Sequence, residues 1–176
     1  MNTQTAPLSS SDTEQDFTTA HTVNAPRDRV FAVWTERDHL QQWFGPKACP
    51  IISCTSDLRP GGMMHYAMQT PGGAMWGRWL YREIAAPERL VFVASFSDEE
   101  GGITRAPFSA GWPLEMLSTV TFEEKGGRTE ITLRASAHNA SDLERETFAA
   151  AHESMRHGWS GTFAQLDDYL AKGCAI

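Results

Sequence analysis

The segment SDLERETFAAAHESMRHGWSGTFAQLDDYL (141–170) decides the fold that the sequence predicts. Ser141 and Glu144 form the S-x-x-E pattern of a capping box, which marks the start of a helix. Large side chains then recur at steps of three or four, which places them on one helical face: Phe148, His152, Met155, Trp159, Phe163, Leu166 and Leu170. We therefore expect one long helix, in which Gly158 and Gly161 indicate a bend or a close approach to the helix backbone.

The chain before this helix has the pattern of strands separated by turns. Six segments between Gly- and Pro-containing breaks predict strands: CPIISCTSDL, MMHYAMQ, AMWGRWLYREI, RLVFVASF, LEMLSTVTFEE and RTEITLRASA. Alternation over residues 17–23 predicts a strand before them, and Pro26 and Gly45-Pro46 enclose two short helices after it. The predicted fold class is α+β: a curved seven-stranded antiparallel sheet around a long C-terminal helix, with two short helices after the first strand.

Composition limits the classes of partner. The 176 residues include 15 Lys and Arg against 22 Asp and Glu, a formal net charge of -7, which argues against nucleic acid and anionic membranes. We expect residues 1–14 to be a disordered tail and residues 15–172 to form a single domain. No apolar run reaches the length of a membrane span, the start lacks a secretory signal pattern, and three cysteines suit a reduced protein, so we expect the cytoplasm.

Several phrases, in this order, resemble the START-like (helix-grip, SRPBCC) superfamily, and within it the family related to the C-terminal domain of the heat-shock-protein-ninety ATPase activator. The phrases are VNAPRDRVFAVWTERDHLQQWFGP (23–46), YREIAAPERLVF (81–92), WPLE (112–115), TVTFEEKGGRTEITL (119–133) and GWSGTFAQLDDYL (158–170). The resemblance implies a helix-grip fold with a deep cavity between sheet and long helix. Relatives bind lipids, sterols or other hydrophobic molecules there, act as cyclase-type enzymes, or stimulate a chaperone.

Aromatic and Met residues are the candidate lining of that cavity. Spacing alone favours an ordinary packed core for them, whereas the resemblance favours a hollow one. The loop 98–113 and the corner 43–46 are expected to border its mouth. The candidate ligand-binding residues are Trp43, Phe44, Met64, Tyr66, Met68, Trp76, Trp79, Tyr81, Phe92, Phe96, Phe108, Trp112, Met116, Met155, Trp159 and Phe163. A one-residue slip in a strand would exchange the faces, so which strand faces line the cavity stays open.

Patterns for catalysis and metal binding are weak. His152 and His157 are five residues apart, whereas two helical metal ligands need a spacing of four. His65 is the better acid or base, but it has no carboxylate partner that the sequence identifies. Arg78, Arg82 and Glu83 suit a solvent face or an ion pair better than a ligand contact. We therefore predict no catalytic residue, no metal and no cofactor.

The leading hypothesis is the binding of a small hydrophobic or aromatic molecule, lipid-like or polyketide-like, in an internal cavity. Two alternatives stay open: a cyclase- or dehydratase-type enzyme that uses the same cavity, and a chaperone-interacting stress-response module. A binding protein is favoured over an enzyme because no convergent acid and base pair is found. The expected partner is the small molecule, with a homodimer and a chaperone left open.

Overall fold

The computed structural model describes residues 15–173, so the tail expected over residues 1–14 lies outside the described residues. Seven strands form one sheet: β1 (Phe17–Val23), β2 (Ile51–Ser56), β3 (Met63–Thr70), β4 (Gly73–Ala85), β5 (Arg89–Ser97), β6 (Glu115–Lys125) and β7 (Arg128–His138). The helices are α2 (Arg27–Thr35), α3 (Arg37–Trp43), α4 (Asp142–Ala150) and α5 (His152–Ala171). All neighbouring strands pair antiparallel, in the order β1-β7-β6-β5-β4-β3-β2. The predicted fold class is confirmed.

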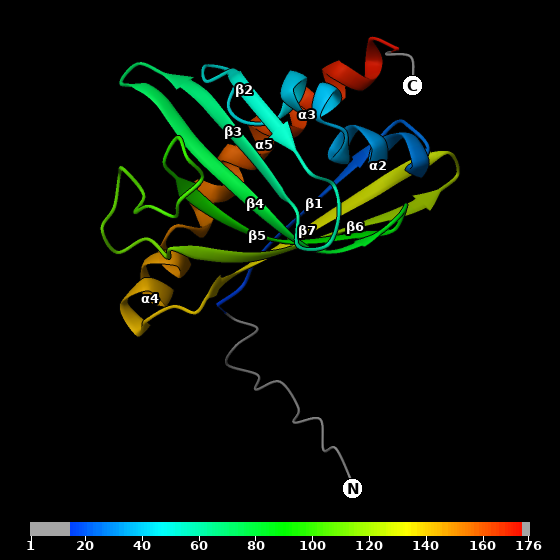
Figure 1. The fold of residues 1–176 in the computed structure, drawn as a ribbon. Helices are drawn as coiled ribbons and strands as arrows, with labels where there is room; N and C mark the ends of the chain where they lie inside the picture. The colour runs from blue at the N-terminus through cyan, green and yellow to red at the C-terminus, as the bar shows by residue number, and fades with distance from the viewer. Residues whose placement is uncertain (1–14, 174–176) are drawn as a thin grey trace, which may run out of the picture.

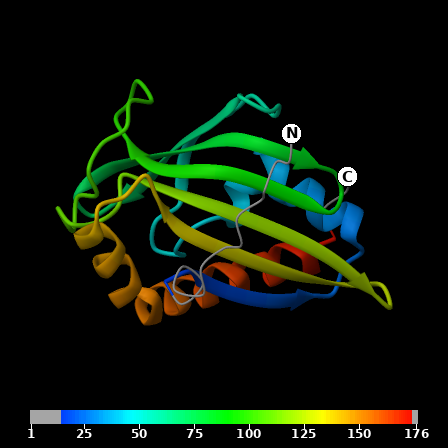
Figure 2. The same cartoon turned by 90° about the horizontal axis from the view of Figure 1, so that it is seen from below.

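The sheet is one curved layer, and α5 lies along its concave side (Figures 1 and 2). Helices α2 and α3 lie toward one end of the sheet and α4 lies at the other (Figure 1). Because side chains alternate along a strand, each strand sends every second residue toward α5. In β3, for example, Met64, Tyr66 and Met68 face the concave side, whereas His65 and Ala67 face the convex side.

The predicted long C-terminal helix is wrong in one respect, because it is two helices. The capping box of Ser141 and Glu144 starts α4 as predicted. The helix α4 ends at Ala150. Ala151 has a φ of -90° and a ψ of -1°, which depart from regular helical values, and α5 begins at the next residue. The edges of the Phe148 and Phe17 rings contact His152 at this junction, at 5.3 and 5.7 Å between ring centroids. The change of direction lets α4 cover the sheet end while α5 follows the concave face.

The core is aromatic at the end where α2 and α3 pack on the sheet. Trp34 is fully buried and contacts Trp43 at 5.0 Å and Phe122 at 5.9 Å between ring centroids. Trp43 is fixed in this position because its indole N–H donates to the Val33 carbonyl at 2.9 Å. Over residues 15–173, none of the helices combines the length and the apolar character that a membrane span requires.

Candidate ligand-binding site

The concave face of the sheet brings most of the candidate residues together with α5. They come from β3, β4, β5 and β6, where the strand alternation sends them inward, and from the inward side of α5. The contributors that are almost fully buried are Trp43, Met64, Met68, Trp79, Tyr81, Phe92, Trp112 and Phe163. These residues have the burial of an ordinary core.

Six further candidates face the same interior but remain only half-buried. We call them the inner-face cluster: Phe44, Tyr66, Phe96, Met116, Met155 and Trp159. Single apolar side chains with some exposure are normal at the rim of a core, whereas these six face one interior. Trp159 stacks on the fully buried Trp34, at 6.0 Å between ring centroids, so the inner-face cluster borders the closed core and differs from it in partial exposure.

Phe44 joins the sheet side of the cluster to the helix side. Its ring meets Tyr66 and Trp79 edge-on, at 5.5 and 5.0 Å between centroids, which is a favourable aromatic geometry. It also lies 6.2 Å from the ring of Trp159 on α5. Phe44 holds this position because α3 ends at Trp43 and the chain turns at Gly45, whose φ is +95°. The corner that the sequence placed at the mouth thus lies between the two layers.

Tyr66 depends on a glycine in the neighbouring strand. It is paired in register with Gly77, and a Cβ at that glycine would lie 2.5 Å from the Tyr66 hydroxyl oxygen. The ring therefore lies directly across the backbone of β4. Burial raises the pKa of Tyr66 well above its ordinary value, whereas a hydrogen bond with the Trp79 side chain acts in the opposite direction. The hydroxyl is consequently neutral and keeps its proton.

The first half of α5 has an exposed glycine at the edge of this interior. Gly158 is exposed, and a Cβ added there would meet no atom within 4 Å. Gly158 is three residues after Met155 and four before the buried Thr162, so it lies on their side of the helix. Further along, α5 closes against the 43–46 corner, where the Gln165 amide donates to the Gly45 carbonyl. The sequence indicated a bend or a close approach at Gly158 and Gly161; no atom lies within 4 Å of a Cβ added at either position, so the close approach is wrong, and α5 continues through both.

Two of the candidate residues lie elsewhere. Trp76 is on the convex face, where it stacks on His65 at 4.7 Å between ring centroids. Trp76 and Trp79 are three residues apart and so lie on opposite faces of the strand. Both were candidates because the sequence does not determine which face of β4 points inward. Phe108, in the 98–113 loop, is 64% exposed and contacts Phe96 and Trp112 with its ring edges. It borders the inner-face cluster from outside.

The convex-face residues around His65 hold the 98–113 loop. The His65 Nε2 atom lies 3.2 Å from the Ser97 hydroxyl and 3.1 Å from the Asp98 carbonyl oxygen. The Arg78 guanidinium donates to the Gly101 carbonyl at 2.7 Å. His65 therefore faces away from the inner-face cluster, and its contacts are those of a structural residue.

The structure also adds residues that the sequence analysis missed. Ala94 and Ala137 are half-buried on the concave face and pack against the same core. They were missed because the search considered only large side chains. The alternation of Ala94 with Phe92 and Phe96 was the signal that could have identified it.

The 15–173 portion contains no group of three or more His, Cys, Asp or Glu side chains placed to hold a metal ion. His152 is packed between Phe17 and Phe148, whereas His157 is exposed. Burial lowers the pKa of His152, and the nearby Arg156 charge acts in the same direction.

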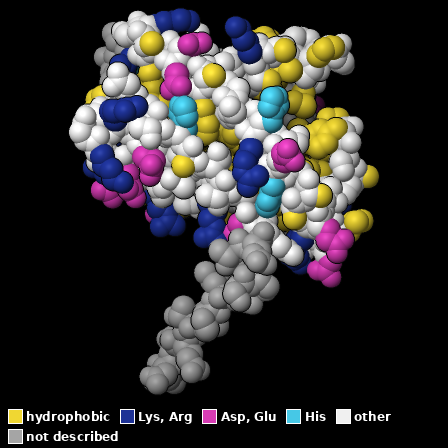
Figure 3. Space-filling view, turned by 180° about the vertical axis from the view of Figure 1, so that it is seen from behind, with side chains coloured by type: hydrophobic (Ala, Val, Ile, Leu, Met, Phe, Trp, Pro, Cys, Tyr) yellow, Lys and Arg dark blue, Asp and Glu magenta, His cyan; other side chains and the backbone are white. Residues whose placement is uncertain are grey.

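Hydrophobic side chains also reach the surface on the α5 side of the molecule. Figure 3 shows them most densely on the flank where α4 and the 98–113 loop lie. A curved antiparallel sheet that grips a C-terminal helix, with half-buried aromatic residues between the two layers, defines a START-like, helix-grip protein.

The particular family follows from comparison with known proteins. Residues 24–171 match the family model described as "Activator of Hsp90 ATPase homolog 1-like protein", and the chain belongs to this family. Among curated proteins, no match is found.

Solved structures of bacterial proteins share the fold. A protein from Arthrobacter aurescens is 27% identical with a TM-score of 0.74, and the alignment covers 91% of this chain and 88% of that one. A protein from Nitrosomonas europaea is 25% identical with a TM-score of 0.72, covering 92% and 97%. A protein from Mycobacterium smegmatis, 24% identical with a TM-score of 0.73 over 90% and 92%, shows likeness of fold alone.

Proposed function

We propose that this protein binds a small hydrophobic or aromatic molecule between the concave face of the sheet and the first half of α5. The observation that carries the proposal is the incomplete burial of the inner-face cluster. A ligand that covers these side chains removes apolar surface from water, which stabilises the complex by about 25 cal/mol per Å² before ordering costs. Membership of a family with a START-like fold is in keeping with ligand binding.

The cluster also favours one kind of polar group on the ligand. Tyr66 accepts a hydrogen bond from the Trp79 side chain and retains its own proton, because burial raises its pKa. An aromatic or aliphatic ligand with a single acceptor, such as a carbonyl or an ether oxygen, would use that proton. A few placed polar groups in an apolar lining are the usual source of orientation in such sites.

The test places a large side chain at Gly158, at the edge of the proposed site. Nile red is a suitable probe because it is neutral and its fluorescence rises in apolar surroundings. In Gly158→Leu the added side chain should occupy the space beside Met155 and weaken Nile red binding about ten-fold, or about 1.4 kcal/mol. The helix should not lose stability, since replacing a helical glycine gains up to about 1 kcal/mol.

Gly161→Leu is the matched control. Gly161 lies in the same helix and, like Gly158, is exposed with no atom within 4 Å of an added Cβ, but at six residues from Met155 it lies off the Met155 side of the helix. It should gain the same helical stability and bind Nile red as the unaltered protein does. Equal binding by both variants, or equal loss in both, would contradict the proposed site. A discrete small-molecule mass that leaves the purified protein on denaturation would identify the chemical class of the natural ligand.

A further inference from the structure

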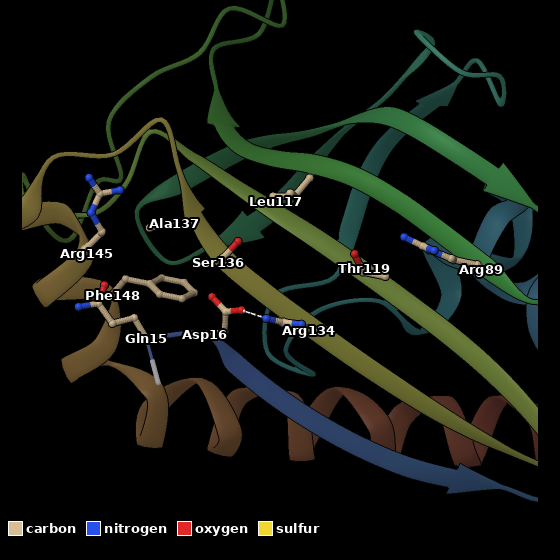
Figure 4. A pocket seen from close by; sticks show the side chains of 10 residues that line it. All are labelled: Gln15, Asp16, Arg89, Leu117, Thr119, Arg134, Ser136, Ala137, Arg145 and Phe148. Atoms are coloured by element: carbon tan, nitrogen blue, oxygen red, sulfur yellow. Dashed lines mark hydrogen bonds and ion pairs between the residues drawn. The ribbon is translucent and has the colours of Figure 1, made fainter. Parts of the chain in front are cut away.

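A groove lies on the outer, convex face of the sheet, on the opposite side from the inner-face cluster. It has a volume of about 560 Å³ and is formed by β5, β6, β7, α4 and the residues just before β1. Figure 4 shows Arg145 and Arg89 at its two ends, with Arg134 between them. We call this site the arginine groove. Its volume is within the range of small-molecule sites.

The charge of the groove is opposite to that of the chain. Three arginines line it against one acidic residue, Asp16, although the whole chain has a net charge of -7. The Asp16 carboxylate is already engaged by Arg134, whose Nε donates to it at 2.7 Å. Glu83 and Asp142 lie beside the groove rather than in its lining, so the lining presents more cationic than anionic groups to a ligand, which favours anions.

The two terminal arginines have free donors. Among residues 15–173, the ion-pair partner of Arg89 is Glu83, at 3.7 Å between Nε and Oε1, and that of Arg145 is Asp142, at the same separation between Nε and Oδ1. Both separations exceed a hydrogen bond, and both carboxylates are well exposed. Among the described residues, neither guanidinium donates a hydrogen bond to a protein group. Guanidinium groups bind carboxylates through paired donors, so both ends of the groove are suited to that group.

Between the arginines the floor is mixed apolar and hydroxylic. The β6–β7 register pairs Leu117 with Ser136 and Thr119 with Arg134, so these side chains lie side by side on the convex face. Arg89 is paired with Thr121, four residues along β6 from Leu117, which is about 13 Å at the rise of a strand. A ligand that reaches both terminal arginines is therefore elongated.

We propose that the arginine groove binds an elongated organic dianion, with a carboxylate at each end and an aliphatic middle over Leu117. The site is separate from the inner-face cluster, and the proposal does not depend on the proposed function. Linear dicarboxylates match the elongated arrangement of the arginines and the mixed floor between them.

The probes are decanedioate, decanoate and succinate, titrated into the isotopically labelled protein and followed by NMR. Decanedioate should shift the amide signals of Leu117, Thr119 and Ser136. Decanoate has the same chain length as decanedioate but only one carboxylate. Succinate has two carboxylates but is too short to span the groove. Both should therefore bind there several-fold more weakly than decanedioate. Arg89→Gln should weaken decanedioate about five-fold, as expected for an exposed charge pair, and remove its advantage over decanoate.

Arg128→Gln is the matched control, because Arg128 is an exposed arginine on the same strand and face as Arg134 but lies outside the groove. It should leave decanedioate binding unchanged. The proposal is overturned if decanedioate and decanoate bind equally at the groove signals, if Arg128→Gln weakens binding as much as Arg89→Gln, or if the shifts occur only at Met155 and Trp159. Unchanged melting temperatures of both variants establish that they fold.

Discussion

The two halves of α5 carry the same apolar stripe but differ in their surroundings. In the second half Phe163, Leu166 and Leu170 are buried where α5 packs on β1 and α3, and Leu166 has no exposed surface. In the first half Met155 and Trp159 face the same interior and stay half-buried, close to the exposed Gly158. One half of the helix therefore belongs to the core and the other half belongs to a candidate site.

This difference shows what helical periodicity measures. A stripe at steps of three or four reports that one face turns away from water, and a closed core and a ligand-binding interior both satisfy it. The polar contacts at the second half explain why it is closed: Gln165 donates to Gly45, and the Asp167 carboxylate lies 2.9 Å from the His21 Nε2 atom. The first half contacts the sheet through Arg156, which lies over the Phe17 ring of β1 at 5.9 Å from its centroid, and among the described residues no hydrogen bond or ion pair joins its side chains to a strand.

The largest expected effect tests the comparison by truncation. Leu166→Ala should lower the free energy of unfolding by about 3 kcal/mol, because it removes a fully buried side chain and leaves a cavity. Met155→Ala should cost about 1 kcal/mol, because part of that side chain already contacts water. Urea denaturation measures both values, with an unchanged m-value as the control for two-state unfolding. Similar losses in the two variants would show that the first half of α5 is core as well.

The sequence predicted the fold well, because fold depends on element order and periodicity. The seven strands, the capping box at Ser141 and the end of α3 before Gly45 all follow from local patterns. The break at Ala151 was missed because alanine is a strong helix former, and the change of direction there comes from tertiary packing of Phe148 and His152.

The candidate site was less predictable for a different reason. The face on which a strand residue lies depends on register, so Trp76 and Trp79 were grouped although they lie on opposite faces. The arginine groove was not predicted because Arg89, Arg134 and Arg145 come from three separate elements. These arginines come close together only because β5, β6 and β7 pair in the sheet and α4 packs beside them.

A smaller effect is expected on the sheet side of the open half. Gly77→Ala would place a Cβ 2.5 Å from the Tyr66 hydroxyl oxygen, so the ring must leave its position across β4. We expect a loss of about 1–3 kcal/mol, typical of overpacking, and weaker Nile red binding because Tyr66 is displaced. Gly73→Ala, at the start of the same strand, has no neighbouring atom but has a φ of +115°, so it separates backbone strain from the clash. Loss of Nile red binding in Gly73→Ala alone would contradict this role of Tyr66.

The smallest expected change in stability concerns the polar contacts between α4 and the 98–113 loop. Glu144 receives a hydrogen bond from Arg105 of the 98–113 loop and another from the Ser141 backbone N–H at 2.8 Å. These contacts lower the pKa of Glu144 from 4.5 to about 2, and the Arg105 hydrogen bond is the main cause. Because the folded-state pKa is the lower one, the stabilisation is complete above pH 4.5 and is lost as the pH falls toward 2.

Glu144→Gln should therefore be less stable than the unaltered protein at pH 6, with a difference that shrinks steadily between about pH 4.5 and 2. The effect should be smaller than the other two, because charge pairs near solvent are screened. Thermal unfolding at a series of pH values measures the difference. Glu146→Gln is the control, because Glu146 lies on the same helix and has no hydrogen-bond or ion-pair partner among the described residues. If Glu144→Gln also strengthens Nile red binding at pH 6, then the loop held by Arg105 limits access to the inner-face cluster. Equal stability of Glu144→Gln and the unaltered protein at every pH would instead show that Glu144 acts only as a helix cap, through geometry that glutamine also provides.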